Sequence, residues 1–426
     1  MILRKVLIIS PHYPPSNLAG VHRSRLFAQH LPTFGWEPII LTVNEKYYEE
    51  QLDWNLLKLI PKDQRIEKVN ARKVIKPRLI GDLGLRAFYQ LRKKAVQLIH
   101  NEKIDFVYIP IPSFYVALIG PYLKRKTGVP FGIDYIDPWV HKFPGSEKVF
   151  SRHWFSTKLA SKLEPKALKG VSLVTGVAEG YYKAVLERHP DLKDNCVCGA
   201  MPYGGEAKDH LMVKELNIQP YLFKKNNKLQ VIYAGAMLPK AYRPLELIFQ
   251  AMNENIQLFN NTEFYFIGTG KTPDDSEGYN LKSLALKYDL WENIVFEFPK
   301  RTPYLDVLAH LNIADAVFIL GSTESHYTPS KTYQAVLSKK PIMAVLHRQS
   351  TAANVISTTH AGMVLTFDGE TEVSKLKDEF PVFFRSFIEF KNSFDASKVD
   401  KNAFDKYSAH NVTRELADLF NKVLAN

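Results

Sequence analysis

The stretch His326–Val345 reads HYTPSKTYQAVLSKKPIMAV and lies between two apolar runs. The run before it, Ala316–Leu320 (AVFIL), is typical of a buried strand, and the glycine and hydroxyl residues that follow predict a turn. Pro341 opens a second apolar run, Ile342–Leu346, which also has the composition of a buried strand. The order strand, turn, helix, strand is that of a parallel sheet whose strands are joined by helices.

The turn inside this stretch has the residues of a phosphate-binding loop. Thr328 or Ser330 is suited to cap a helix, and Pro329 is suited to the first turn, where a missing N–H is tolerated. Lys331 then adds a positive charge beside the helix start, where anions bind. The alternative is an ordinary strand–helix junction whose Lys331 is solvated.

Pro329-Ser330-Lys331, followed by a helix and a Lys-Pro-Ile run, resembles the nucleotide-sugar-binding segment of family-four glycosyltransferases with the GT-B fold. Many bacterial members read Pro-Ser-Lys-x-x-Glu-Tyr and continue through Gly-x-Pro-Ile. Gln334 stands where that Glu is expected. The family's commoner signature is two Glu with seven residues between them, and the first of the two falls on His326. The resemblance implies that Gln334 accepts hydrogen bonds from the donor ribose and that His326 contacts the transferred sugar.

The fold class expected is α/β, because strand-like and helix-like runs alternate in two similar halves. The GT-B resemblance implies two Rossmann-like, doubly wound domains that face an interdomain cleft. We predict an N-terminal acceptor-side domain over residues 1–210, completed by a crossing helix at 407–426. The donor-binding domain is predicted over 211–406, with a polar hinge region around 206–228.

Glycine-bearing loops follow several predicted strands, at the edge where open α/β sheets bind ligands. In the related enzymes these loops approach the donor diphosphate. The donor-binding candidates are Gly20, Gly235, Lys240, Arg243, Gly268, Gly270, Pro329, Ser330, Lys331 and Gln334. A simple tight turn at the first loop, and plain surface charges at Lys240 and Arg243, are the alternatives.

A second motif, Asp134-Tyr135-Ile136-Asp137-Pro138-Trp139, ends a predicted strand of the first half. Related transferases often show Asp-x-Arg-Asp-Pro-Trp here, facing the cleft. Asp134 and Asp137, with His326, are therefore the catalytic candidates, because a carboxylate can orient an acceptor hydroxyl or take its proton. Arg23 and Trp139 are the acceptor-side candidates. Ile136 replaces the family's Arg, and the alternative role of the two acids is to cap the next segment.

The composition is that of an ordinary globular protein: 426 residues, 46% hydrophobic and 23% charged. There is no apolar run of about 18 residues that could span a membrane, and the N-terminus reads as a strand rather than a signal peptide. The two cysteines, Cys196 and Cys198, are one residue apart and suit neither a structural disulfide nor a metal site. A cytoplasmic location is expected.

The net charge is +12, and basic residues are concentrated in Lys58–Lys94, where leucines and isoleucines are interleaved with them. Such a stretch predicts peripheral docking on an anionic membrane surface. A solvated face is the alternative. No recognised nucleic-acid-binding motif accompanies the charge, so no nucleic-acid partner is expected.

The function predicted from the resemblance is a retaining glycosyltransferase of the hexosyl or N-acetylhexosaminyl type. It would transfer sugar from a nucleotide-diphosphate sugar, UDP-sugar above all, to a saccharide or lipid-linked acceptor in bacterial surface polysaccharide or glycolipid synthesis. No Asp-x-Asp metal motif occurs in the chain, so no cofactor or metal is expected. Two alternatives stay open: a catalytically silent GT-B binding protein and a sugar-nucleotide epimerase.

Overall fold

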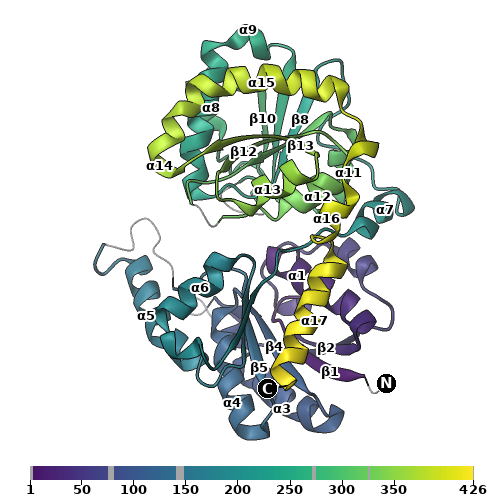
Figure 1. Cartoon of the computed structure of the whole chain (residues 1–426), viewed down its shortest axis with the longest axis vertical. Helices are drawn as coiled ribbons and strands as arrows, with labels where there is room; N and C mark the ends of the chain where they lie inside the picture. Colours follow the sequence, from purple (N-terminus) through teal and green to yellow (C-terminus); the bar gives the residue numbers. More distant parts are fainter. Residues whose placement is uncertain (1–2, 75–80, 141–147, 271–274, 325–326, 426) are drawn as a thin grey trace. The chain divides into compact units, whose positions relative to one another are not determined.

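The computed structural model describes residues 3–74, 81–140, 148–270, 275–324 and 327–425. Figure 1 shows the chain divided between two compact units. The N-terminal unit comprises Met1–Tyr203 and Ala409–Asn426, and the C-terminal unit comprises Gly204–Ser408. The predicted boundary at 210–211 falls inside helix α7 (Ala207–Glu215), which lies wholly in the C-terminal unit.

In its described ranges, the N-terminal unit contains a seven-stranded parallel sheet in the order β3-β2-β1-β4-β5-β6-β7. The strands are β1 (Arg4–Ile9), β2 (Trp36–Val43), β3 (Arg65–Val69), β4 (Phe106–Ile111), β5 (Phe131–Tyr135), β6 (Leu173–Gly176) and β7 (Val197–Ala200). Its helices are α1 (Ala19–His30), α2 (Leu83–Arg86), α3 (Phe88–Glu102), α4 (Ile119–Thr127), α5 (Arg152–Ala167), α6 (Glu179–Arg188) and α17 (Ala409–Ala425). Apolar residues fill the inner strands, which are buried on both faces.

Helix α17 covers one face of this sheet, although it comes last in the chain. Its Phe420 ring lies 5.1 Å from Trp36 and 4.6 Å from Phe106, measured between ring centroids. Leu416 and Phe420 are fully buried there. The N-terminal unit is therefore built from both ends of the chain.

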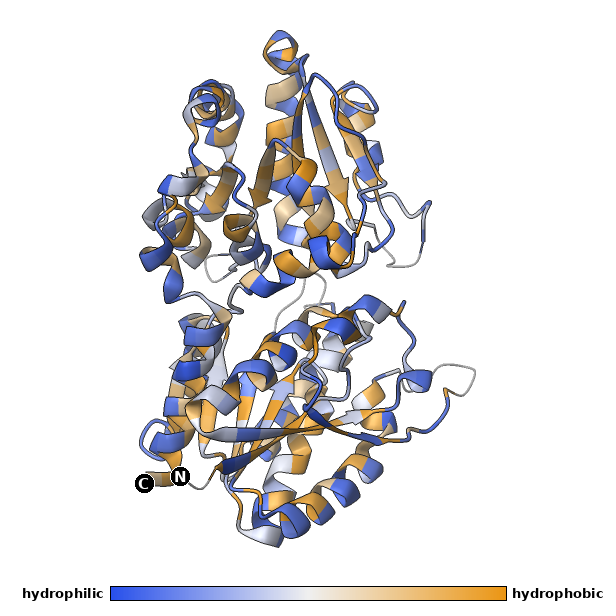
Figure 2. Ribbon diagram, turned by 90° about the vertical axis from the view of Figure 1, so that its right-hand side faces the viewer, coloured by the Kyte–Doolittle hydropathy of each residue, from blue (hydrophilic) through white to orange (hydrophobic). Residues whose placement is uncertain are grey.

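The C-terminal unit contains, over its described residues, a six-stranded parallel sheet in the order β10-β9-β8-β11-β12-β13. The strands are β8 (Leu229–Ala234), β9 (Thr262–Ile267), β10 (Val295–Phe298), β11 (Ala316–Leu320), β12 (Ile342–His347) and β13 (Gly362–Phe367). Its helices are α7, α8 (Tyr242–Glu254), α9 (Ile256–Phe259), α10 (Lys282–Lys287), α11 (Tyr304–Ile313), α12 (Lys331–Leu337), α13 (Thr351–Thr358), α14 (Gly369–Glu372), α15 (Leu376–Ser393) and α16 (Lys401–Asp405). Figure 2 shows hydrophobic residues along the strands and polar residues on the outer helix faces.

Both sheets are doubly wound, and each has one point where the strand order reverses. In the N-terminal unit the chain runs outward from β1 to β3, returns to β4 and then runs the other way. In the C-terminal unit the same reversal separates β8 from β11. Loops diverge at the carboxyl ends of such neighbouring strands and leave room for a ligand. The fold thus offers one candidate ligand position in each unit.

Strand β3 was not predicted from the sequence, and it lies inside the basic stretch Lys58–Lys94. Several of its charges are paired: Arg65 lies 2.7 Å from Glu102, and Lys94 lies 2.8 Å from Glu67. Lys68 likewise lies 2.8 Å from Glu45. Part of the predicted membrane-docking stretch is therefore an edge strand held by ion pairs; residues 75–80 of it lie outside the described residues. None of the helices in the described ranges combines the length and apolar character of a membrane span.

Candidate functional site

The reversal point of the C-terminal sheet brings Gly235 next to Lys331. Gly235 follows β8 with φ +115°, a conformation that side chains rarely adopt, and its N–H donates to the Ile267 carbonyl at 2.8 Å. A Cβ atom at this position would lie 3.3 Å from the Lys331 ammonium nitrogen. Glycine therefore serves both the turn and the close approach of the lysine.

The Lys331 ammonium is buried, and none of the described residues accepts a hydrogen bond from it. Nζ lies 3.5 Å from the centroid of the Tyr233 ring, a cation–π contact that offsets part of the cost of burial. Burial holds the pKa of Lys331 well below its usual range. A buried cation without an anionic partner is costly, so this position is prepared for a negatively charged ligand.

Two neighbouring loops complete this edge of the sheet. Gly268 follows β9 with φ +71°, and a Cβ there would come within 4.0 Å of the Gly235 nitrogen. Gly270 is needed for packing, because a Cβ there would lie 2.6 Å from the Pro299 carbonyl oxygen. Lys240, in the loop after β8, lies 3.4 Å from Glu324, and its carbonyl accepts from the Thr323 N–H at 3.3 Å. The loops after β8, β9 and β11 thus converge.

Arg243 lies apart from this group. It is exposed on α8 and pairs with Glu246, one turn further along the helix, at 3.3 Å. This placement is that of a surface ion pair, the alternative considered for this residue above.

Helix α12 begins after Ser330, the later of the two predicted N-cap residues. Pro329 precedes the helix instead of occupying its first turn, and Ser330 is the N-cap residue, although its side chain makes no capping hydrogen bond. Lys331 is the first helical residue. His326 lies outside the described residues, so its predicted contact with the sugar stays a prediction.

Gln334 has a partner that the sequence gave no reason to expect. Nε2 of His210, on α7, lies 2.9 Å from the Gln334 Oε1 atom. Burial lowers the pKa of His210, and the hydrogen bond with Gln334 opposes that shift in part. The neutral imidazole then donates its Nε2–H to the amide oxygen. A ribose hydroxyl would have to share that oxygen with His210.

In the N-terminal unit, Arg23 and Asp134 pair with each other. The Arg23 guanidinium donates to Asp134 at 2.6 and 3.0 Å and also to the carbonyls of Met201 and Pro202. Thr175 donates to Asp134 at 2.8 Å, and both charged side chains are 0% exposed. This corrects the predicted substrate contacts of both residues, because neither presents an atom to a ligand. Arg23 is therefore the charge partner of Asp134, although Ile136 stands where the related enzymes have an Arg.

The remaining N-terminal candidates occupy different environments. Asp137 is exposed just after β5, so it is the carboxyl of the Asp-Tyr-Ile-Asp-Pro-Trp motif that a solute can reach. Trp139 is buried and stacks on Phe114, with ring centroids 5.7 Å apart. Gly20 lies in α1, where a Cβ would meet Pro112 at 3.3 Å, so packing explains this glycine.

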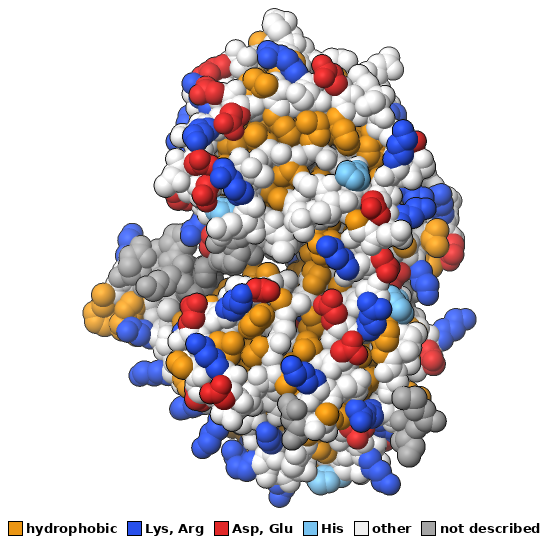
Figure 3. Space-filling view, viewed as in Figure 1, with side chains coloured by type: hydrophobic (Ala, Val, Ile, Leu, Met, Phe, Trp, Pro, Cys, Tyr) orange, Lys and Arg blue, Asp and Glu red, His pale blue; other side chains and the backbone are white. Residues whose placement is uncertain are grey.

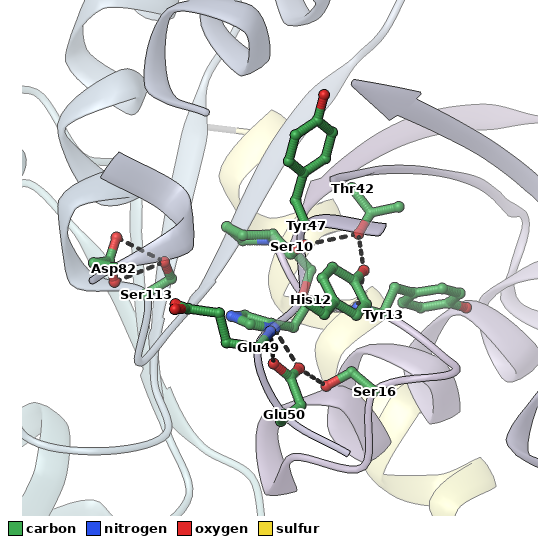
Figure 4. A network of polar contacts seen from close by, with 12 residues as sticks. Ser10, His12, Tyr13, Ser16, Thr42, Tyr47, Glu49, Glu50, Asp82 and Ser113 are labelled. Carbon is green, nitrogen blue, oxygen red and sulfur yellow. Dashed lines mark hydrogen bonds and ion pairs between the residues drawn. The ribbon is translucent and has the colours of Figure 1, made fainter. Parts of the chain in front are cut away.

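A polar network that the sequence analysis missed lies at the reversal point of the N-terminal sheet (Figure 4). It joins His12, in the loop after β1, to Glu50 and Ser16. Nearby, Asp82 accepts a hydrogen bond from Ser113, which follows β4. These residues are far apart in the chain, and no short motif links them.

Helix α5 and the residues before it carry exposed apolar side chains next to exposed lysines. Exposed apolar side chains gather where the chain enters this helix, and Figure 3 shows hydrophobic side chains at the left edge of the N-terminal unit near Lys and Arg. We call them, with the exposed lysines of the same helix, the α5 patch. It consists of Val149, Phe150, Phe155, Leu159, Lys158, Lys162 and Lys166.

Two doubly wound parallel sheets, one in each unit, define the GT-B fold. Anabaena HepE, solved in complex with UDP, is similar over 98% of this chain and 100% of that one, with 14% identity and a TM-score of 0.60. Sucrose-phosphate synthase from Thermosynechococcus elongatus is similar over 99% of both chains, with 12% identity and a TM-score of 0.62.

A third solved structure, a Listeria monocytogenes protein provisionally described as a UDP-N-acetylglucosamine 2-epimerase, covers 99% of this chain and 96% of its own. Its identity is 12% and its TM-score 0.53. No family model and no curated protein sequence matches the chain. At these identities the likeness establishes the fold.

Proposed function

We propose that this protein is a glycosyltransferase that binds a nucleotide-diphosphate sugar in its C-terminal unit. The observation that carries the proposal is the Lys331 ammonium, which is buried beside Gly235 without a hydrogen-bond acceptor among the described residues. A diphosphate supplies the missing negative charge, and the backbone of the converging glycine loops allows its close approach. UDP is the nucleotide proposed, because HepE of the same fold was solved with UDP.

The chemistry follows from the charge that develops during transfer. When the bond between the sugar and the diphosphate breaks, negative charge accumulates on phosphate oxygens, and preorganised cations stabilise it. Lys331 is positioned for that role, and Lys240 lies in an adjoining loop. Protein cations thus replace a divalent ion, and we propose metal-independent transfer to a saccharide or lipid-linked acceptor.

A membrane-bound acceptor would explain the α5 patch. Exposed aromatic residues beside lysines are suited to the interface of an anionic bilayer. We propose the α5 patch, rather than Lys58–Lys94, as the membrane contact, because several charges of Lys58–Lys94 are held in ion pairs. We therefore propose peripheral association through α5.

An epimerase of nucleotide sugars is the second candidate, because the Listeria structure shares the fold. Both activities need the same diphosphate site, so the site alone does not separate them. The separating experiment incubates the full chain with a panel of nucleotide sugars and oligosaccharide acceptors and follows nucleotide release and sugar isomerisation by NMR. Nucleotide release that depends on an acceptor supports a transferase, and isomerisation without an acceptor supports the epimerase. Binding of UDP with neither reaction supports the silent binding protein.

A further inference from the structure

Lys331 and Gln334 lie on the same side of α12. They are three residues apart, and side chains at this spacing are neighbours on a helix surface. Three residues span about 4.5 Å along the helix axis, and the ribose of a nucleotide is bonded directly to its phosphate. A nucleotide whose phosphates reach the Lys331 ammonium can therefore place its ribose against Gln334.

The acceptor atom of the Gln334 amide is already occupied. Oε1 lies 2.9 Å from Nε2 of His210, and the neutral imidazole donates its N–H to that oxygen. The amide nitrogen is bonded to the same carbon and points away from His210. Among the described residues it has no hydrogen-bond acceptor, and the side chain is partly exposed. Gln334 thus presents an N–H donor to a ligand, and its oxygen is shared.

Helix α7 holds His210 at this position. The preceding residue, Asp209, is buried and accepts a hydrogen bond from the Tyr304 hydroxyl of α11 at 2.8 Å. Glu206 caps the start of α7 by accepting from the Lys208 N–H at 3.0 Å. All of these residues belong to the C-terminal unit, in which Figure 1 shows α7 beside α11 and α12.

The segment that follows α7 is fixed to the same helix. The backbone N–H groups of Tyr221 and Leu222 donate to Nε2 of His310, on α11, at 3.0 and 2.9 Å. The other ring nitrogen of His310 donates to the Asp306 carbonyl, and the ring is fully buried. Helix α7 is therefore anchored to α11 on both sides of His210, so the imidazole stays beside Gln334.

An acceptor that is already paired does not select strongly for ribose hydroxyls. A site with free acceptors rejects a deoxy analogue, because the analogue leaves those acceptors unpaired. In this protein a missing hydroxyl leaves nothing unpaired, since Oε1 of Gln334 keeps its hydrogen bond with His210. The second lone pair of Oε1 can accept from one hydroxyl only.

We propose that His210 is a specificity-determining residue, which lets the donor site take 2′-deoxyribonucleoside diphosphate sugars as well as ribonucleoside diphosphate sugars. His210 acts through Gln334, by holding the amide oxygen that would otherwise select for ribose. It is therefore a positioning residue. This inference rests on the proposed function, in which the C-terminal unit binds a nucleotide-diphosphate sugar.

The test measures the affinity of the full chain for UDP and for 2′-deoxy-UDP by calorimetry. Wild type should bind the two within about two-fold of each other. His210→Phe keeps an aromatic ring but removes the N–H, so Oε1 is left unpaired unless a hydroxyl donates to it. This variant should bind UDP about three- to ten-fold more tightly than 2′-deoxy-UDP. Lys208→Ala, which changes an exposed residue of the same helix, is the matched control and should keep the wild-type ratio.

The ratio of the two affinities separates selectivity from folding. A merely structural effect of His210→Phe would weaken the binding of both nucleotides equally and leave the ratio unchanged. Gln334→Met, alone and together with His210→Phe, completes a double-mutant cycle. Without the amide oxygen, the substitution of His210 should no longer change the ratio.

Equal preferences for UDP in wild type and in His210→Phe would overturn the proposal. A change in the ratio that persists in the Gln334→Met background would also overturn it, because His210 would then act on the ligand by another route. Failure of the proposed function looks different: wild type then binds neither UDP nor 2′-deoxy-UDP.

Discussion

The Arg23 guanidinium holds both carboxylate oxygens of Asp134, at 2.6 and 3.0 Å, and neither side chain is exposed. The pair links α1 to β5, and two further Arg23 bonds fix the carbonyls of Met201 and Pro202, where the N-terminal unit leads into the C-terminal one. Removing one partner leaves the other charge buried and unpaired, which costs more than the pair contributes.

Asp134→Ala should therefore lower the free energy of unfolding of the N-terminal unit by about 3–5 kcal/mol. Urea titration followed by circular dichroism measures the change. Asp194→Ala, which removes an exposed carboxyl elsewhere in the same unit, should change stability by less than about 0.5 kcal/mol. Equal stabilities for the two variants would contradict a structural role for the pair.

The buried Lys331 should lower the stability of the folded protein when no ligand is bound. Because the pKa of Lys331 is lowered in the folded state, the unfolded state binds more protons between that pKa and the ordinary value of about 10.4. Stability should therefore rise with pH across that interval. Lys331→Met should raise the melting temperature without ligand and remove this part of the pH dependence.

The same variant should bind UDP about ten- to a hundred-fold more weakly, since a charge-assisted hydrogen bond contributes about 1.5–3 kcal/mol. Its affinity for uridine, which lacks phosphate, should not change. At a pH above the lowered pKa of Lys331 in the free protein, calorimetry in buffers of different ionisation enthalpy should show proton uptake when wild type binds UDP. The exposed lysine variant Lys287→Met is the control; equal losses for uridine and UDP would remove Lys331 from the phosphate site.

Gln334→Glu should tighten donor binding several-fold, or about 1 kcal/mol, because a carboxylate is a stronger acceptor for ribose hydroxyls than an amide. One oxygen of the new carboxylate can accept from His210 while the other stays available for ribose. The change should also raise the pKa of His210, which NMR titration of its ring protons measures. A donor analogue without both ribose hydroxyls should bind the variant and wild type alike; a gain that persists with the analogue would place residue 334 away from the ribose.

Transfer activity should persist in excess chelator, because protein cations stabilise the leaving diphosphate. Initial rates with and without EDTA, on protein dialysed against chelator, measure this. Loss of activity that magnesium or manganese restores would show that a bound ion performs the role assigned to Lys331 and Lys240.

Vesicles that contain anionic lipid should bind the protein through the α5 patch, and binding should weaken as salt screens the lysines. Replacing Phe150 and Phe155 by Ser should lower vesicle binding in a flotation assay. Replacing Lys73 and Lys93 by Ser, in the basic stretch, is the matched control. Greater loss from the control pair would return the contact to Lys58–Lys94.

The inner strands could be predicted because a parallel sheet buried on both faces requires continuous apolar runs, as Ala316–Leu320 shows. Strand β3 could not, since three of its five residues, RIEKV, are charged and it lacks the continuous apolar run of an inner strand. The start of helix α12 could be narrowed only to Thr328 or Ser330, because Pro329 between them has the usual signature of a first helical turn. Apolar runs in the sequence thus predicted the buried strands. A strand at the edge of the sheet, which is partly exposed and carries charged residues, has no such run.

The candidate site was predictable only where a short motif carries it. Lys331 stands in such a motif, but its burial depends on Tyr233 and Gly235, nearly a hundred residues earlier. The partners of Gln334 and His12 are likewise distant in the chain, at His210 and Glu50. Asp134 matched a family motif, and only the packing of α1 against β5 shows that Arg23 neutralises it.

Helix α17 belongs to the N-terminal unit but follows the C-terminal unit in the chain, and this affects when each unit can finish folding during synthesis. The C-terminal unit is one continuous segment, so all of its residues are available once residue 408 has left the ribosome. The first segment of the N-terminal unit emerges before the C-terminal unit, but the helix that covers Trp36 and Phe106 emerges after it. The N-terminal unit is therefore completed after the C-terminal one, and until then an apolar sheet face needs protection from other chains.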